Sequence, residues 1–228
     1  MIMTERADEI GRGTLARVAA FVYRYLVLGL FLALLGAPTM IMWILLEPSV
    51  SNAIPFVAAL APVAPALSAA LYAQRDWSRA PDLNPGRALW RGLRINLVDT
   101  LKWWLPVLAV AAVLTVNLGY ADTVPGGQTL RPVCLVLLAA LALWSGHLLA
   151  VTAYFSFRTR DALRVAAAEL ARWRPTLGLA ALLVVAVATV LLTSEAVLLA
   201  TGWAFAGLLR LTLRPVEADV AERFVQRG

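Results

Sequence analysis

The sequence predicts an all-α, polytopic membrane protein. Of its 228 residues, 61% are apolar and only 15% are charged, and the mean hydropathy is +0.77. A soluble domain carries about 25% charged residues. The apolar residues form long continuous runs rather than alternating with polar ones, which favours transmembrane helices over barrel strands. This composition excludes a disordered chain, a disulfide-stabilised secreted domain and an ordinary soluble enzyme.

Six apolar runs predict six transmembrane helices within a single domain, 1–228. A helix needs about 20 apolar residues to cross a hydrocarbon core of about 30 Å. The sixth run reaches that length only if the side chain of Arg210 extends back to the interface. The expected spans are 25–46, 53–74, 103–121, 132–156, 175–194 and 196–213.

The distribution of basic residues predicts the orientation of these spans. Nineteen of the twenty Lys and Arg residues lie on one side of the six-span arrangement, and Arg131 alone lies on the other. The positive-inside rule therefore places both chain termini in the cytoplasm. The first apolar run is too long for a signal-peptide core, which predicts an uncleaved anchor. The net charge of +6 is interpreted as affinity for anionic lipid and not for nucleic acid, because the basic residues flank apolar runs.

Two amphipathic helices are expected on the cytoplasmic surface, over 85–101 and 160–173. Asn84 and Pro85 are typical of a helix start. The expected apolar stripes are Leu89, Leu93, Leu97 and Leu101 in the first helix, and Leu163, Ala166, Ala167, Leu170 and Trp173 in the second. Such helices either anchor the chain at the membrane surface or dock a cytoplasmic partner. The candidate docking residues are Arg87, Trp90, Arg91, Arg94, Arg164 and Arg172.

Prolines interrupt the second expected span. Pro62 and Pro65 each lack a backbone donor and so leave a carbonyl without its helical partner. In a membrane those carbonyls must be covered by protein or line a wet cavity. The span is therefore either a broken helix beside a solute path or a kinked helix that packs closely through small residues such as Ser68. Pro62, Pro65, Ser68 and His147 are the candidate residues of such a path.

His147 is the single histidine of the chain and falls in the middle of the fourth expected span. An ionisable group at that depth is a functional candidate by default. The alternative is a neutral imidazole that is hydrogen-bonded to a neighbouring helix. Only the first interpretation gives His147 a functional role, either in proton transfer or in binding a ligand.

The motifs of the common enzyme classes are missing from the sequence. It contains no G-x-x-x-x-G-K-[ST], no H-E-x-x-H and no G-x-S-x-G pattern, and these motifs mark nucleotide-binding, zinc-protease and hydrolase sites. One cysteine, Cys134, and one histidine cannot form a metal cluster. We therefore expect a protein that is not an enzyme and binds no cofactor and no metal.

Three segments carry a resemblance to a known family. These are 61–72 (APVAPALSAALY), 75–77 (RDW) and 88–96 (ALWRGLRIN), which ends in Asn96. With them the chain resembles the YesL family of small bacterial integral membrane proteins, although it carries two prolines where the family pattern has one. The resemblance implies a location in the bacterial plasma membrane and an accessory role beside carbohydrate importers of the ATP-binding-cassette type. It implies no catalytic residues.

Three functions follow as expectations. The first is a non-enzymatic accessory subunit that contacts the lipid bilayer and importer subunits through its surface helices. The second is a stand-alone transporter of a small solute that uses the proline-broken span. The third is an intramembrane enzyme, for which His147 is the available acid or base.

Overall fold

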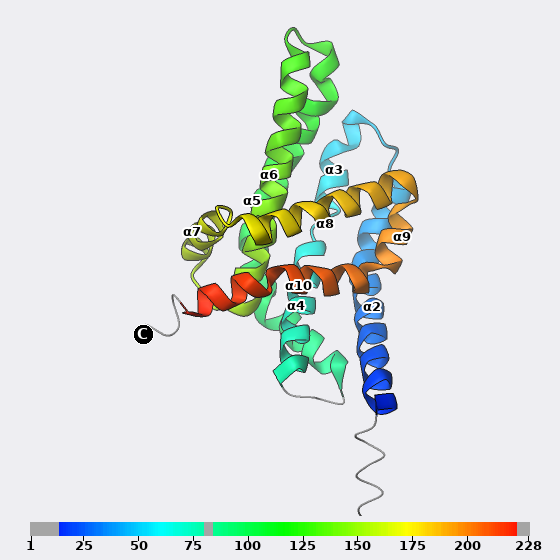
Figure 1. The fold of residues 1–228 in the computed structure, drawn as a ribbon. Helices are drawn as coiled ribbons and strands as arrows, with labels where there is room; N and C mark the ends of the chain where they lie inside the picture. The colour runs from blue at the N-terminus through cyan, green and yellow to red at the C-terminus, as the bar shows by residue number, and fades with distance from the viewer. Residues whose placement is uncertain (1–13, 80–83, 223–228) are drawn as a thin grey trace, which may run out of the picture.

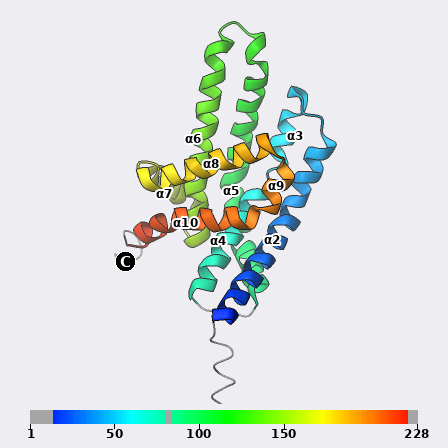
Figure 2. The same ribbon diagram turned by 45° about the vertical axis from the view of Figure 1, so that its right-hand side comes forward.

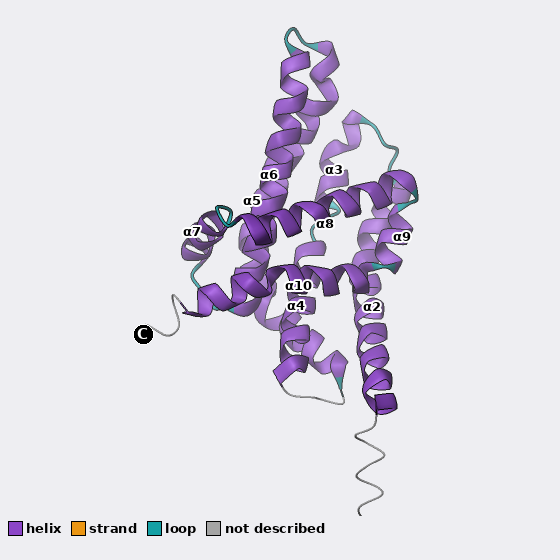
Figure 3. Ribbon diagram, in the orientation of Figure 1, coloured by secondary structure: helices purple, strands orange, loops and turns teal. Residues whose placement is uncertain are grey.

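The computed structural model describes residues 14–79 and 84–222, and these residues form helices and connecting loops without any strand (Figure 3). The predicted all-α class is confirmed. The helices are α2 (Thr14–Leu45), η1 (Val50–Asn52), α3 (Ala53–Ala58), α4 (Val63–Arg79), α5 (Pro85–Tyr120), η2 (Ala121–Thr123), α6 (Gly127–Tyr154), α7 (Thr159–Glu169), α8 (Trp173–Leu192), α9 (Glu195–Ala200) and α10 (Gly202–Val220).

Five helical stretches among the described residues are long and apolar enough to cross a membrane. They are Thr14–Leu45, Val50–Arg79, Pro85–Thr123, Gly127–Tyr154 and Trp173–Leu192. These stretches support a multi-pass membrane protein in contact with lipid. The chain ends, 1–13 and 223–228, lie outside the described residues, so their cytoplasmic location stays a prediction.

The sixth expected span, 196–213, is corrected by the structure. Its residues are divided between the short helix α9 and the helix α10, with Thr201 between them. The α10 helix has 19 residues and carries four charged side chains, Arg210, Arg214, Glu217 and Asp219. That many charges make a continuous passage through hydrocarbon costly. The described residues therefore contain five candidate spans and not six.

The first expected surface helix is not a separate element. Residues 85–101 and all but the last residue of 103–121 belong to one helix, α5, which is 36 residues long, ends at Tyr120 and contains Pro106. A proline inside a helix removes one hydrogen bond and bends the helix, but it does not have to end it. The second expected surface helix, 160–173, corresponds to the separate helix α7, which ends at Glu169.

The last helices cross the others instead of running beside them. In Figures 1 and 2, α2, α5 and α6 run along the long direction of the molecule, and α8 and α10 lie across them. The α10 helix contacts α2, α4, α6 and α8. The molecule is therefore not a simple bundle of parallel spans.

Small residues allow α4 to lie at the centre of the helices. Ala66, Ala69, Ala70 and Ala73 are all buried on this helix, and α4 contacts α2, α5, α6 and α10. Lipid tails are as apolar as leucine, so helices associate in a membrane largely through close packing of small side chains. The alanine-rich sequence of α4 favours that close approach.

Candidate functional site

The helix break between α3 and α4 leaves backbone carbonyls that neighbouring helices cover. Side chains from α2 and α5 donate a hydrogen bond to each of three carbonyl oxygens near the break. These bonds join Thr39 Oγ1 to Ala59 (2.6 Å), Trp43 Nε1 to Phe56 (3.0 Å) and Trp104 Nε1 to Leu60 (3.1 Å). The expected break is present, and protein donors occupy these carbonyls as the lipid environment requires.

The four residues of the expected solute path are absent from the walls of four cavities in the described part of the chain. Pro65 and Ser68 are buried in α4, and His147 is fully buried in α6. The cavity beside the break has a volume of about 400 Å³ and a mainly apolar lining.

His147 connects α6 to the start of α8. Its Nε2 lies 3.0 Å from Thr176 Oγ1, and that hydroxyl donates to the carbonyl of Leu170 at 3.1 Å. The hydroxyl therefore accepts from an Nε2–H group of the imidazole ring. This geometry corresponds to the structural alternative for His147.

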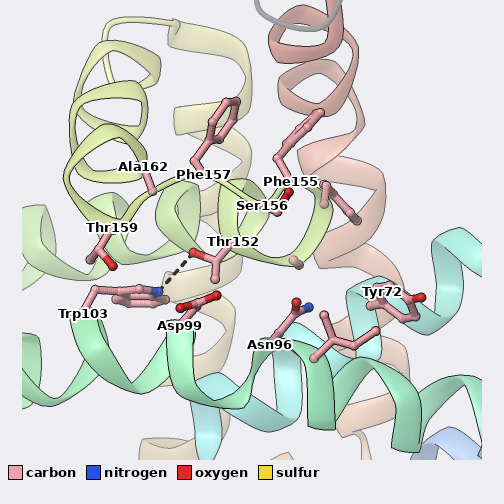
Figure 4. Close-up of a pocket in the computed structure, with 13 residues that line it drawn as sticks. Tyr72, Asn96, Asp99, Trp103, Thr152, Phe155, Ser156, Phe157, Thr159 and Ala162 are labelled. Atoms are coloured by element: carbon pink, nitrogen blue, oxygen red, sulfur yellow. Dashed lines mark hydrogen bonds between the residues drawn. The ribbon is translucent and has the colours of Figure 1, made fainter.

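A polar pocket of about 210 Å³ opens between α5, the end of α6 and the start of α7. Figure 4 shows Asn96 and Asp99 on α5 facing the segment of Phe155, Ser156 and Phe157. The remaining wall residues are Tyr72, Ile95, Trp103, Thr152, Ala153, Tyr154, Thr159 and Ala162. This pocket combines amide, carboxylate and hydroxyl groups with aromatic rings at the arginine-rich ends of the helices.

Several polar groups in and beside this pocket have no protein partner. Asn96 is 8% exposed and its Nδ2 is buried without a hydrogen bond. The hydroxyl groups of Thr100 and Tyr154 are buried and unpartnered as well. A buried polar group without a partner destabilises a protein by about 1–3 kcal/mol. Such groups therefore mark a place where a water molecule or a ligand can bind.

The walls of the polar pocket are fixed by close contacts. Trp103 is buried and donates from Nε1 to Thr152 Oγ1 at 3.1 Å. Tyr72 lies directly against Gly92, where a Cβ atom would come within 2.8 Å of the ring. In contrast, Asp99 is half exposed and forms an exposed pair with Lys102 at 2.8 Å, a pair of the kind that adds little stability.

The tryptophans near the arginine-rich ends of the helices lie in two different environments. Trp90 and Trp173 are exposed, at 59% and 66%. Trp77 and Trp103 are buried, because α4 and α5 pack against other helices at that level. The hydropathy pattern does not distinguish these two environments.

The structure exposes five of the six candidate docking residues. Four of them define what we name the basic face of α5. This face consists of Arg87, Trp90, Arg91 and Arg94, all of which are exposed. Arg164 is exposed on α7. Arg172 instead forms ion pairs with Glu169 at 3.3 Å and with Asp219 at 2.9 Å. These pairs connect the start of α8 to α10.

The expected apolar stripe of 85–101 differs from the face that packs. The buried residues of this part of α5 include Ala88, Leu89, Gly92, Asn96 and Thr100. The leucine spacing predicted that Leu97 is part of the packed face. In the structure Leu97 is exposed. The prediction of the packed face from the leucines was wrong because the side of a helix that faces the membrane is as apolar as the side that packs against protein.

The fold and these sites define a multi-pass membrane protein with a polar pocket and a basic face at its arginine-rich end. No family model, no curated protein and no solved structure matches the chain. The resemblance to the YesL family therefore stays a prediction based on the segments 61–72, 75–77 and 88–96.

Sequence reasoning did not identify the polar pocket. Asn96 was noted only within the resembling segment 88–96, and Tyr154 was not singled out. A usable signal was present, because Gly92, Asn96 and Thr100 recur at the spacing of one helix face. Small and polar residues at that spacing on an apolar helix indicate a helix–helix contact.

Proposed function

We propose that this chain is a non-enzymatic accessory membrane subunit of a bacterial carbohydrate importer of the ATP-binding-cassette type, docking through the basic face of α5. The observation that carries the proposal is the exposure of all four residues of that face. The carbohydrate and importer parts rest on the family resemblance alone.

The basic face has the composition of a docking surface. Arginine and tryptophan contribute most to the energy of protein interfaces, and guanidinium groups pair in a bidentate manner with carboxylates. The α5 helix continues without a break from this face into its apolar part, so a partner bound here would be held rigidly at the membrane. The expected partner surface is acidic and cytoplasmic.

Co-purification with importer subunits tests this proposal. The full-length tagged protein is extracted from its native membrane in mild detergent, beside a triple variant Arg87→Gln, Arg91→Gln and Arg94→Gln. We expect the variant to lose most of the bound partner, because it loses three of the charges available for pairing.

The matched control removes the same charge from other exposed positions, in the triple variant Arg158→Gln, Arg160→Gln and Arg174→Gln. This control is expected to retain the partner. Equal retention by all three proteins, or the recovery of a protein without any importer subunit, would contradict the docking proposal.

A second candidate function, a stand-alone transporter of a small solute, is favoured by the polar pocket. Asn96 offers a buried and unpartnered amide donor there, and the aromatic rings of Trp103 and Phe155 line the same wall. Ligand pockets typically combine apolar walls with a few oriented polar groups. The helix break supports this function less, because protein donors already bind its carbonyls.

Uptake by reconstituted vesicles tests the transporter. We expect Asn96→Ala to reduce uptake of the transported solute by about tenfold, since it loses a buried hydrogen bond to the ligand. Asn117→Ala is the control, because Asn117 lies on the exposed outer part of α5 and donates to its own helix. Absence of uptake of every small sugar and polyol offered would exclude this candidate.

A further inference from the structure

Four arginines and one glutamate line a further cavity, between α4 and α10. The cavity has a volume of about 410 Å³. We name it the arginine cavity, and its lining residues are Arg75, Ser78, Arg79, Arg210, Arg214, Glu217, Ala218 and Ala221. These residues lie far apart in the sequence, and only the packing of α10 against α4 brings them together.

The arginine cavity has an excess of positive charge. Glu217 is its single acidic residue. The carboxylate pairs with Arg75 at 2.6 Å and more distantly with Arg79 at 3.8 Å. Arg214 is exposed and forms no ion pair with any described residue. The formal charge of the cavity lining is therefore +3, and an anion is the complementary ligand.

Arg210 is the buried member of the arginine cavity. It is 8% exposed, and its Nη2 donates to Ser78 Oγ at 2.8 Å. Its Nη1 is buried without a hydrogen-bond partner. A guanidinium group buried in this way is unfavourable unless an anion or another acceptor compensates it.

Arg75 is held in place from the other side of the cavity. Its Nη1 donates to the carbonyl of Tyr154 at 2.6 Å, and its guanidinium group lies 5.2 Å from the centre of the Tyr154 ring and 5.5 Å from that of Phe155. An arginine stacked on aromatic rings is already ordered before a ligand binds. Arg75 and Arg210 are thus held in place by protein contacts, and the exposed residues Arg79 and Arg214 complete the set of arginines in the lining.

We propose that the arginine cavity binds a phosphate group. Arginine side chains match the oxygens of a phosphate in charge and in planar geometry, and Ala218 and Ala221 leave room beside them. Basic pockets between membrane helices on the cytoplasmic side bind lipid headgroups. The phosphate belongs either to a phospholipid headgroup or to a soluble phosphate compound. This site is separate from the basic face of α5 and adjoins the polar pocket, because Tyr154 and Phe155 line that pocket and also contact Arg75.

Binding measurements on the full-length protein test the proposal. The protein is placed in nanodiscs of phosphatidylcholine, and its thermal midpoint is followed in two titrations, one with inorganic phosphate and one with phosphatidylglycerol. A ligand that binds the folded state raises the midpoint. We expect Arg210→Gln and Arg214→Gln to weaken the binding of the active probe about ten- to a hundredfold, the factor of one lost charge-assisted hydrogen bond.

Arg214→Gln decides the result if Arg210→Gln fails to fold, because Arg214 is exposed. Arg158→Gln removes an exposed charge elsewhere and is expected to leave the affinity unchanged. A response to phosphate assigns a soluble ligand, and a response to phosphatidylglycerol alone assigns a lipid headgroup. A wild-type protein that responds to neither probe, or an equal loss in Arg158→Gln and Arg214→Gln, would overturn the proposal.

Discussion

The two halves of α6 have the same apolar character and opposite surroundings. In its last ten residues, Ser145–Tyr154, every residue except Gly146 is buried. In the preceding part, Gly127–Trp144, only Gly127 and Cys134 are buried. Figure 1 shows the C-terminal end of α5 and the N-terminal end of α6 projecting as a helical hairpin beyond the other helices. Hydropathy therefore identifies a membrane helix without telling which part of it packs against protein.

The buried half of α6 is also the half that meets the polar groups. The polar pocket and the carbonyl that orients Arg75 both lie at its end. Burial here depends on the contacts with α4, α7 and α10. The stability of the molecule and its candidate sites should therefore be concentrated in the arginine-rich end.

The largest expected effect is the replacement of a buried leucine in α6. Leu148 is fully buried, and Leu148→Ala should lower the free energy of unfolding by about 2–5 kcal/mol, because it leaves a cavity. The matched variant Leu137→Ala changes a half-exposed leucine on the same helix and should have little effect. Unfolding in detergent micelles measures both, and equal losses would refute the contrast between the halves.

A smaller loss is expected at the helix break. Trp104→Phe removes the donor to the carbonyl of Leu60 while keeping most of the apolar surface. The carbonyl of Leu60 keeps its bond from the backbone N–H of Val63 at 3.0 Å, so the loss of one hydrogen bond should lower the free energy of unfolding by about 0.5–1.5 kcal/mol. Trp173→Phe is the control, because Trp173 is 66% exposed. If both variants unfold like the wild type, the tryptophan does not stabilise the break.

Two glycines of α5 should respond in opposite directions. Gly92→Ala brings a methyl group within 2.8 Å of the Tyr72 ring and should cost about 1 kcal/mol, the lower end of the overpacking range. At Gly86 no atom outside the helix lies closer than 3.8 Å, so Gly86→Ala should raise stability by about 0.5–1 kcal/mol. Chemical denaturation of the two variants measures the difference. A gain in stability in both variants would show that Tyr72 does not press on α5.

The smallest effect concerns pH and Glu169 on α7. Burial raises the pKa of Glu169 above its ordinary value, and Asp219 adds to the increase while Arg172 opposes it. The folded state therefore binds the proton more tightly than the unfolded state. Its contribution to stability is present at low pH and is lost as the pH rises from the ordinary glutamate pKa to the raised one.

Thermal unfolding as a function of pH measures this contribution. Glu169→Gln should flatten the decrease in stability over that pH window, because the amide carries no proton to lose. Asp161→Asn changes an exposed carboxylate on the same helix and should leave the slope unaltered. The assignment to Glu169 would be wrong if its variant kept the slope of the wild type.

The sequence predicted much of the architecture and little of the site. Long apolar runs indicated the helices α2, α5, α6 and α8, and the prolines indicated the break before α4. Asn96 and Arg210 lie in segments that the sequence describes only as helical. Their burial depends on which helices meet there, and that depends on contacts between residues far apart in the chain.

By itself, the sequence determined the all-α class, the positions of the apolar helices and the asymmetric distribution of arginine. The first two follow from the free energy of transferring a side chain into lipid, which is a property of local composition, and the third is read directly from the arginine positions. Only the tertiary structure decided that 196–213 is not a single span, that α5 packs through Gly92 and Asn96, and that α10 brings Arg210 to α4. The protein interior and the lipid are similarly apolar, so hydropathy does not determine which helices pack together. The shape of the helix surfaces and the positions of small residues determine the helix contacts.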